Sequence, residues 1–389
     1  MDSSQSTPVD RFSERVVNIE QSATIRFGNI ARELRADGVD VISMAGGSPD
    51  FPTPEHIREA AIEAIERDEN QLTTTQGLPA LRNAIAEKLR TENDVPTDAE
   101  RIVVTPGSKF SLFQAIFTLL QAGDEVALLD PSWVTYEAIV TVAGGTINRV
   151  RLDPDTGFSP GSADLSTEIT DETQLIVVNN PSNPAGAVFS RAELETIRDL
   201  AIDHDCWVIA DEIYERLVHD GEHISIGSLD GMADRTVTVN GFSKAYAMSG
   251  WRLGYFSAPE PLVDQVRKLQ SNTVSCPTTL VQHAGVAALN GPQGVVEEMR
   301  RTYEERVDQV TDTLHAEGID IPKPAAAFYV FVPVDGDDLQ LCEELLREEH
   351  VATVPGSAFG VPGYIRLALT ADGDTLETGI RRIAPYLGE

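Results

Sequence analysis

The stretch GFSKAYAMSGWRLG, at residues 241–254, follows a run of buried-type β-branched residues and holds Lys244 and Arg252 eight positions apart. A lysine placed just after a strand end reaches into the ligand crevice of an open α/β sheet. Burial and positive neighbours there lower the pKa of the amine, which leaves it neutral and able to bond to a carbonyl carbon. Arg252 offers a planar guanidinium fork suited to a phosphate. The stretch therefore predicts a covalently held ligand that carries a phosphate; the alternative is a surface lysine and arginine in a strand connection.

Short β-branched runs surround this stretch and alternate with helical patterns, which is typical of a parallel sheet with helices on both faces. The runs lie at residues 101–105, 125–129, 175–179, 207–211, 236–239 and 254–257. We expect an α/β fold whose large domain contains a mostly parallel sheet of the seven-stranded type, flanked by helices. In such sheets ligands bind beyond the carboxyl ends of the strands.

The chain ends predict a second, smaller unit. Residues 325–334 (AAAFYVFVPV) and 364–369 (YIRLAL) read as strands, and residues 339–349 and 375–387 read as helices. Because 389 residues exceed the size at which one core keeps growing, we expect two lobes. The expected division is an N-terminal segment of a small α+β domain at 1–45, a large ligand-binding domain at 46–289 and the rest of the small domain at 290–389. Between them, Thr53 is expected to cap a helix whose first residue is Pro54.

Two further motifs join the lysine stretch. VIADEIYERL, at residues 208–217, ends a strand at Asp211 and has Tyr214 three positions on, and VVNNPSNPAGAVFS, at 177–190, contains Asn183. With the lysine stretch they resemble the class I aminotransferases among the fold-type-I enzymes that use pyridoxal 5'-phosphate (PLP), from Ser22 to the last helix. The resemblance implies that Lys244 binds PLP covalently.

The resemblance also implies the roles of the residues around the cofactor. Asp211 would keep the pyridine nitrogen protonated, Tyr214 would bond the phenolic oxygen, and Asn183 would touch that oxygen and the substrate carboxylate. Arg252 and Ser243 would bind the phosphate. Without the resemblance, Asp211 could simply cap a helix and the Asn-Pro pairs could mark turns.

Other candidate residues lie along the rest of the chain. Gly107, Ser108 and Lys109 stand between a strand and an amphipathic helix, where free N–H groups and the positive helix end favour an anion. The resemblance implies that Trp133 stacks on the cofactor ring and contacts the substrate. It also places Gly47 and Arg366 at the substrate α-carboxylate, with Arg366 binding it through two parallel hydrogen bonds. Taken alone, a tryptophan is more often core and an arginine on a strand is more often exposed.

One departure concerns the phosphate. Leu72 stands where the family usually has a tyrosine that crosses a dimer interface to reach it. The resemblance implies a homodimer, and the leucine would remove one hydroxyl partner of the phosphate.

We expect a ping-pong aminotransferase that exchanges the amino group between an L-amino acid and a 2-oxo acid, with 2-oxoglutarate as acceptor. Aspartate, aromatic and alanine-type donors stay open, because the side-chain pocket draws on positions such as Phe27, Tyr136 and Phe328. The same scaffold also hosts carbon-sulfur lyases and related synthases. A PLP-sensing regulatory domain is a third reading, opposed by the absence of a DNA-binding module before residue 40.

Composition limits the possible partners. The formal net charge is -32, with 62 Asp and Glu against 30 Lys and Arg, so we expect neither nucleic acid nor an anionic membrane as a partner. Such acidity with few lysines resembles proteins of salt-accumulating organisms, so we expect a halophilic, cytoplasmic protein. The 3 cysteines form no CxxC motif and predict neither disulfides nor zinc. His219 and His223 lie in a turn-rich segment, a poor metal scaffold, so no metal is expected.

Overall fold

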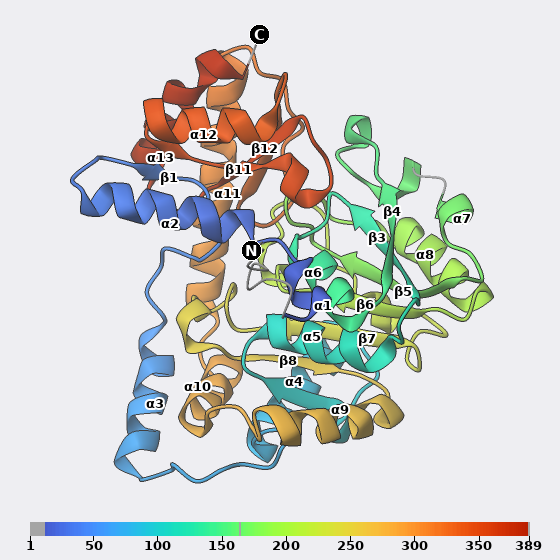
Figure 1. Ribbon diagram of the computed structural model, residues 1–389. Helices are drawn as coiled ribbons and strands as arrows, with labels where there is room; N and C mark the ends of the chain where they lie inside the picture. Colours follow the sequence, from blue (N-terminus) through green and yellow to red (C-terminus); the bar gives the residue numbers. More distant parts are fainter. Residues whose placement is uncertain (1–11, 163–164, 388–389) are drawn as a thin grey trace, which may run out of the picture.

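A seven-stranded sheet forms the centre of the computed structural model, which describes residues 12–162 and 165–387 (Figure 1). Its strand order is β2-β8-β7-β6-β5-β3-β4, and all of its strands run parallel except β8, which is antiparallel to β2 and β7. The strands are β2 (Ile102–Thr105), β3 (Glu125–Asp130), β4 (Thr146–Arg151), β5 (Thr173–Asn179), β6 (Trp207–Asp211), β7 (Thr236–Gly241) and β8 (Gly254–Ser257). This mostly parallel sheet confirms the predicted fold class.

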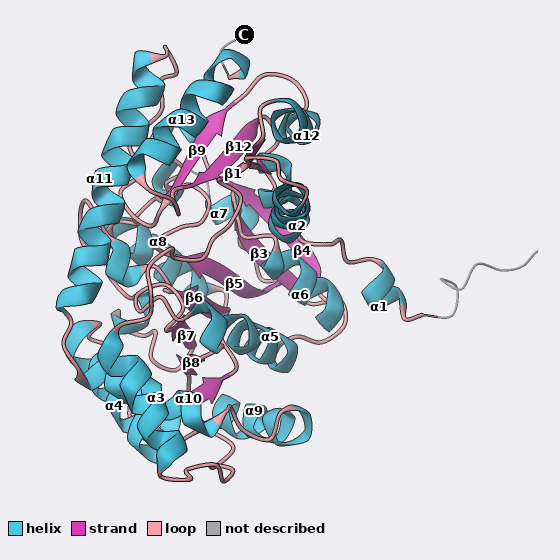
Figure 2. Ribbon diagram, turned by 90° about the vertical axis from the view of Figure 1, so that its left-hand side faces the viewer, coloured by secondary structure: helices cyan, strands magenta, loops and turns pink. Residues whose placement is uncertain are grey.

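Helices cover both faces of this sheet. Figure 2 shows the strands between α5 and α6 on one side and α8 and α11 on the other. The helices are α1 (Glu14–Val17), α2 (Ala23–Ala36), α3 (Glu55–Glu66), α4 (Pro79–Glu92), α5 (Ser108–Leu119), α6 (Thr135–Ala143), α7 (Leu165–Glu168), α8 (Arg191–Asp203), α9 (Glu260–Thr273), α10 (Thr279–Asn290), α11 (Gly294–Ala316), α12 (Asp338–Glu348) and α13 (Gly373–Ile383). No helix within the described residues is long and apolar enough to span a membrane.

Strand β5 shows how the sequence builds two cores at once. Leu175 and Val177 point into the core under α5, α6 and α9, whereas Ile176 and Val178 point into the core on the opposite face. Successive side chains of a strand face opposite sides, so a run that is apolar at every position is buried on both faces. The continuous apolar runs therefore fix this sheet as the middle layer.

Residues 42–43 and strands from the part of the chain after residue 328 form two small sheets at the top of Figure 1. Strand β1 (Ile42–Ser43) pairs in parallel with β10 (Val351–Ala352), and Ile42 lies opposite Val351. Strands β11 (Val354–Pro355), β12 (Tyr364–Ala368) and β9 (Tyr329–Pro333) form an antiparallel sheet in that order. The N-terminal segment is thus tied to the last hundred or so residues of the chain by a strand ladder.

Two local expectations differ from the structure. Strand β4 was not among the predicted runs, because its sequence TINRVR carries polar side chains at the sheet edge. The helix expected after Thr53 begins one residue later, at Glu55, with Pro54 as its N-cap residue. Thr53 does not cap it: its hydroxyl donates to the Ala247 carbonyl at 2.8 Å and accepts from Trp251 Nε1 at 3.0 Å. The expectation was wrong because Thr53 braces the loop that carries Lys244.

Candidate active site

The carboxyl ends of β5, β6 and β7 open onto a cavity of about 410 Å³. Asn179 and Asp211 are the last residues of β5 and β6, and Lys244 follows the end of β7 by three positions. Of the predicted site residues, Gly107 is absent from the lining. The structure brings the others together around this cavity: Gly47, Ser108, Lys109, Trp133, Asn183, Asp211, Tyr214, Ser243, Lys244, Arg252 and Arg366.

Lys244 lies in the floor of the cavity. Its Nζ donates to the Gly47 carbonyl and lies 5.5 Å from the ring centroids of both Tyr214 and Phe328. Burial lowers the pKa of the amine, and Arg366 lowers it further, against the opposing effect of Asp211. A larger share of neutral amine follows, which is the form that attacks a carbonyl carbon.

Asp211 is buried across the cavity. Tyr136 donates its hydroxyl to Oδ2 at 2.7 Å, and the Ile213 N–H donates to Oδ1 at 3.3 Å. Burial raises the pKa of the carboxyl to about 6, although both hydrogen bonds and Lys244 oppose the shift. A carboxyl in this state gains most from a ligand that brings an N–H⁺ group next to it.

The phosphate end lies at the start of α5. Gly107 is its N-cap at a φ of 87°, and a Cβ there would collide with the Arg252 guanidinium, so only glycine allows this approach. The hydroxyl of Ser108 donates to the Asn240 carbonyl at 2.9 Å, which leaves the N–H groups of the first turn for an anion. Burial, with Arg252 and Lys244, lowers the pKa of the Lys109 ammonium. This gathering of cationic groups and N–H donors fits a phosphate.

Arg366, on β12, is buried on the opposite side of the cavity. Its Nη1 donates to Asn183 Oδ1 at 3.1 Å and its Nη2 to the Ala45 carbonyl at 2.7 Å. Its Nε is buried and has no hydrogen-bond partner among the described residues. Burial lowers the pKa of the guanidinium. A buried donor without a partner costs about 1–3 kcal/mol, so the position fits a carboxylate that would satisfy it.

Three cavity residues have no cofactor role in the sequence analysis. Tyr136 was expected in the side-chain pocket, and it instead supports Asp211. Tyr329 bonds the Tyr214 hydroxyl at 2.9 Å, and Asn179 donates to the Asp211 carbonyl at 2.9 Å. Spacing could have indicated Asn179, because it ends a strand as Asp211 does. Tyr329 could not have been found in this way, because it lies in a strand whose sequence is typical of the hydrophobic core.

Five other residues of interest lie off the cavity lining. Phe27 and Phe328, both expected near the substrate side chain, are fully buried in the core. His219 bonds the Ala327 carbonyl at 2.6 Å, whereas His223 faces Glu212 at 3.2 Å, so the two histidines serve different partners. Leu72 is 79% exposed on the surface.

Comparison with known proteins places the chain in a family. Residues 39–383 match the family described as aminotransferase class I and II. The aspartate/prephenate aminotransferase of Thermus thermophilus is 38% identical over 382 residues, covering 97% of this chain and 98% of that protein. A probable aspartate/prephenate aminotransferase of Aquifex aeolicus is 40% identical over 388 residues, with 97% and 98% coverage. The chain belongs to the class I and II aminotransferases.

The solved structures agree. The structure of Thermus thermophilus aspartate aminotransferase with maleate superposes with a TM-score of 0.94 at 38% identity, over 97% of this chain and 99% of that one. The protein is thus an aminotransferase, and its family uses PLP. The cavity fits that cofactor, because the buried Asp211 carboxyl, the Lys244 amine and the cationic side chains of Lys109 and Arg252 line one space.

Replacing the buried carboxyl tests its electrostatic cost. Its folded pKa of about 6 lies above the reference value of 3.8, so the stability it contributes is present below pH 3.8 and is lost as pH rises through 6. We expect Asp211→Asn to stabilise the cofactor-free protein at pH 7.5 by roughly 1–3 kcal/mol, and by less at pH 4. Urea unfolding at both pH values measures this. The exposed Asp264→Asn on α9 is the control, and a less stable Asp211→Asn at pH 7.5 would contradict the expectation.

Proposed function

We propose that this aminotransferase moves the amino group of a dicarboxylic L-amino acid, aspartate first, to 2-oxoglutarate by a ping-pong mechanism. The observation that carries this proposal is the number of cations around the cavity: Lys109, Lys244, Arg252 and Arg366 all line it. Every amino acid brings one carboxylate and the cofactor brings a phosphate and an aldehyde. Arg366, Arg252 and Lys244 are enough for these three groups. Lys109 is left over and can bind a further anionic group.

Lys109 is placed to meet a second substrate carboxylate. Its Nζ lies 4.7 Å from the centroid of the Trp133 ring, on the cavity lining. We assign its backbone N–H to the phosphate, at the first turn of α5, and its ammonium to the distal carboxylate of the substrate. Charged hydrogen bonds of this type are stronger than neutral ones, so they select dicarboxylic substrates.

The named relatives support this choice of substrate. Both curated relatives carry aspartate and prephenate in their names, and the Thermus structure was solved with maleate, a small dicarboxylate. Each of these compounds carries two carboxylates. We infer the same charge pattern for the substrates of this protein.

The residue roles follow from this geometry. Bound PLP supplies an aldehyde carbon that takes up the amino group and a ring that withdraws electrons. We assign Arg366, with Asn183 and Gly47, to the α-carboxylate, and Asp211 to the proton on the ring nitrogen. Lys244 Nζ then lies on the side from which it removes and returns the proton at the substrate Cα.

The remaining cofactor contacts complete the proposal. Tyr214 and Asn183 bond the phenolic oxygen, and Trp133 stacks on the ring. The phosphate is held by Arg252, Ser243 and the backbone N–H groups of Ser108 and Lys109, and Gly107 allows Arg252 to approach closely. Arg252 donates Nη1 to the Ser249 carbonyl at 2.9 Å, which orients the rest of its fork.

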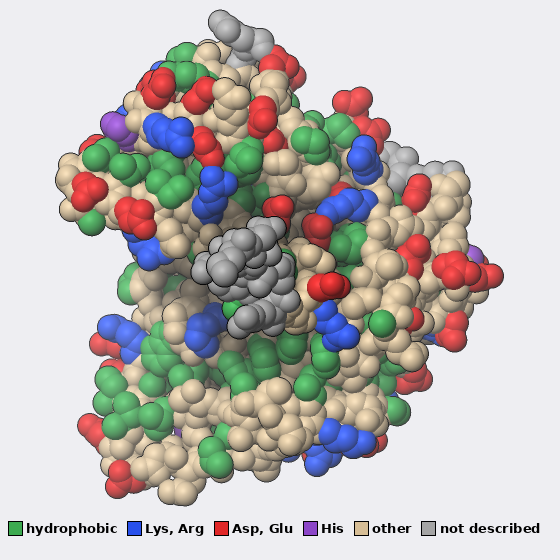
Figure 3. Space-filling view, in the orientation of Figure 1, with side chains coloured by type: hydrophobic (Ala, Val, Ile, Leu, Met, Phe, Trp, Pro, Cys, Tyr) green, Lys and Arg blue, Asp and Glu red, His purple; other side chains and the backbone are tan. Residues whose placement is uncertain are grey.

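We also propose the domain division of the chain, its oligomeric state and its location in the cell. We propose that 1–45 and 290–389 form the small domain and 46–289 the large one, a division that the pairing of β1 with β10 supports. Residues 1–11, 163–164 and 388–389 lie outside the described part of the chain. The protein is a cytoplasmic homodimer. Apolar side chains gather over α5 in Figure 3, where Phe110, Phe113 and Phe117 stack at centroid distances of 5.8 and 5.5 Å.

Steady-state kinetics with donor and acceptor pairs in high salt test the proposed substrate. We expect aspartate to consume 2-oxoglutarate faster than alanine or phenylalanine does. Lys109→Gln should raise KM for aspartate on the order of 10- to 100-fold and change KM for alanine little, because only the distal carboxylate loses its partner. Lys268→Gln, an exposed lysine on α9, is the control. Ammonia release without an oxo acid would instead indicate a lyase, and an equal loss for both donors would refute the role of Lys109.

Sedimentation equilibrium tests the dimer. We expect the wild-type chain to sediment as a dimer and Phe113→Asp to sediment as a monomer, because burying a carboxylate in an apolar interface is costly. Ile202→Asp is the control, since Ile202 is 41% exposed on α8, across the sheet. A wild-type monomer, or a dimer that Ile202→Asp breaks instead, would contradict this proposal.

Thermal melting against KCl tests the salt requirement. The formal net charge is -32, so the acidic side chains of the folded protein repel one another in dilute buffer. Near 1 M salt the screening length falls to roughly 3 Å, so we expect the melting temperature to rise by several degrees between 0.1 and 2 M KCl. A melting temperature that does not respond to KCl would remove the basis for calling the protein halophilic.

A further inference from the structure

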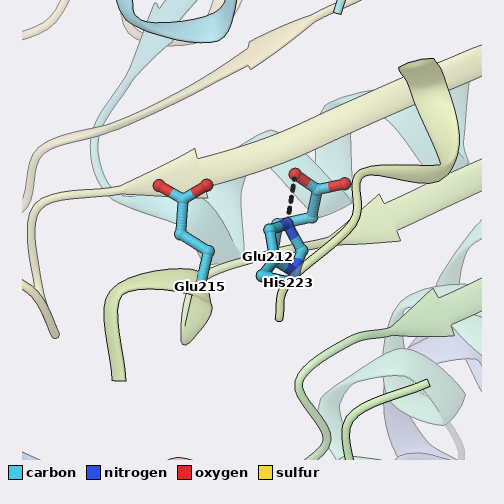
Figure 4. Close-up of side chains that lie close together, drawn as sticks. All are labelled: Glu212, Glu215 and His223. Carbon is cyan, nitrogen blue, oxygen red and sulfur yellow. Dashed lines mark ion pairs between the residues drawn. The ribbon is translucent and has the colours of Figure 1, made fainter. Parts of the chain in front are cut away.

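A second polar cluster lies behind the wall of the cavity that contains Asp211. Glu212 is the next residue after that strand end, and its side chain does not line the cavity. It is 2% exposed, and Ser225 donates its hydroxyl to Oε1 at 2.6 Å. His223 Nε2 lies 3.2 Å from Oε2, with its side chain 10% exposed (Figure 4). A buried carboxylate and imidazole therefore stand directly behind the carboxyl that faces the cavity.

A second carboxylate completes this cluster. Glu215, which Figure 4 shows beside Glu212 and His223, is paired with Lys88 of α4. Asn93 Nδ2 donates to Glu215 Oε2 at 2.5 Å and Asn93 Oδ1 accepts from Lys88 Nζ at 2.7 Å. Both charged side chains are 7% exposed. Burial would raise the pKa of Glu215, but Lys88 and His223 lower it to about 2, so it is ionised.

The charge of the cluster depends on His223. Two carboxylates, Glu212 and Glu215, face one ammonium, Lys88, and Tyr255 of β8 is the neutral neighbour of both carboxylates. Arg216 also acts on Glu215, but it is paired with Glu92, and these two charges cancel. Among the remaining groups, an imidazolium at His223 brings the sum of charges to zero. Burial is the largest single influence on the pKa of His223 and lowers it, but the charge and hydrogen bond of Glu212 and the charge of Glu215 together outweigh it, so the net shift favours the charged ring.

The negative charge of Glu212 acts on the pKa of Asp211. Among the influences that raise the pKa of Asp211, burial is the largest and the Glu212 carboxylate is another. An uncompensated negative charge next to Asp211 would favour its protonated form. In that form it could no longer hold a proton on a ring nitrogen.

We propose that His223 is a positioning residue of the transamination: paired with Glu212, its imidazolium cancels the charge behind Asp211 and keeps the Asp211 carboxylate ionised against the ring nitrogen. This inference rests on the role proposed for Asp211. Glu212, Glu215 and His223 also offer ligand atoms within 4.8 Å of one another. A metal ion there would face Lys88, however, and would add positive charge to a cluster that His223 already balances.

The first test reads the imidazole itself in the cofactor-free protein. Nitrogen NMR of ¹⁵N-histidine-labelled protein, assigned with His223→Gln, follows its titration. We expect His223 to stay protonated above pH 7 in the wild type, and its pKa to fall by at least one unit in Glu212→Gln. A His223 that is neutral at pH 7 would overturn the proposal.

The second test follows the ring nitrogen, with ¹⁵N-labelled PLP bound to the protein. His223→Gln should lose the ring proton at a lower pH than the wild type and reduce kcat by about 10-fold, the rate factor for about 1.4 kcal/mol, with KM little changed. His219→Gln, at a half-buried histidine outside the cluster, is the control. A ring titration in His223→Gln that matches the wild type would overturn the inference.

The double variant separates charge from packing. Glu212→Gln combined with His223→Gln removes both charges, so we expect it to regain most of the ring titration and of kcat, whereas a purely structural defect would deepen.

If Asp211→Asn leaves the ring nitrogen unaffected, the proposed function fails. If Asp211→Asn acts and His223→Gln does not, this inference alone fails. Calorimetric titration with Zn²⁺ is a last check, and binding that His223→Gln abolishes would replace our proposal with a metal site.

Discussion

Burial of the Asp211 carboxyl at the end of β6 is the constraint on which the rest of the site depends. Its side-chain hydrogen bonds in the described part of the chain come from a tyrosine hydroxyl and a backbone N–H, which leave a pKa of about 6. The same parallel strands bring the buried amine of Lys244 to this edge. A bound ligand with a cationic ring would stabilise the Asp211 carboxylate, and a carbonyl carbon on the same ligand would offer the Lys244 amine a group to bond to. The two groups together therefore favour a cofactor such as PLP.

Charge is distributed unevenly between the outside of the protein and this cavity. The chain as a whole carries -32, whereas four cationic side chains line one space of about 410 Å³. An anionic substrate is therefore repelled by much of the surface and attracted at one place. Screening by salt weakens the repulsion over long distances and leaves the short contacts in the cavity.

The sequence was sufficient to predict the site residues that directly follow strand ends. Lys244 and Asp211 were predicted from their places after strand ends and from the resemblance to the aminotransferases, and both line the cavity. Six strands differ from prediction by no more than two residues at either end. Strand β4 was missed because an edge strand needs no continuous apolar run. Thr53 was misread because its partners, Ala247 and Trp251, are about 200 positions away along the chain. The partners of Tyr136 and His223 are likewise set by tertiary packing, which local pattern does not encode.

The pairing of β1 with β10 determines the order in which the two halves of the cavity can form during chain synthesis. Ile42 pairs with Val351, so a growing chain cannot form this ladder until residue 351 has been made. Residues 102–257, which carry Lys109, Asp211, Lys244 and Arg252, contain all seven strands of the large sheet and are made well before that point. The nascent protein can therefore form the half of the cavity proposed to hold the cofactor first. Arg366, in the half proposed to hold the substrate carboxylate, is added last.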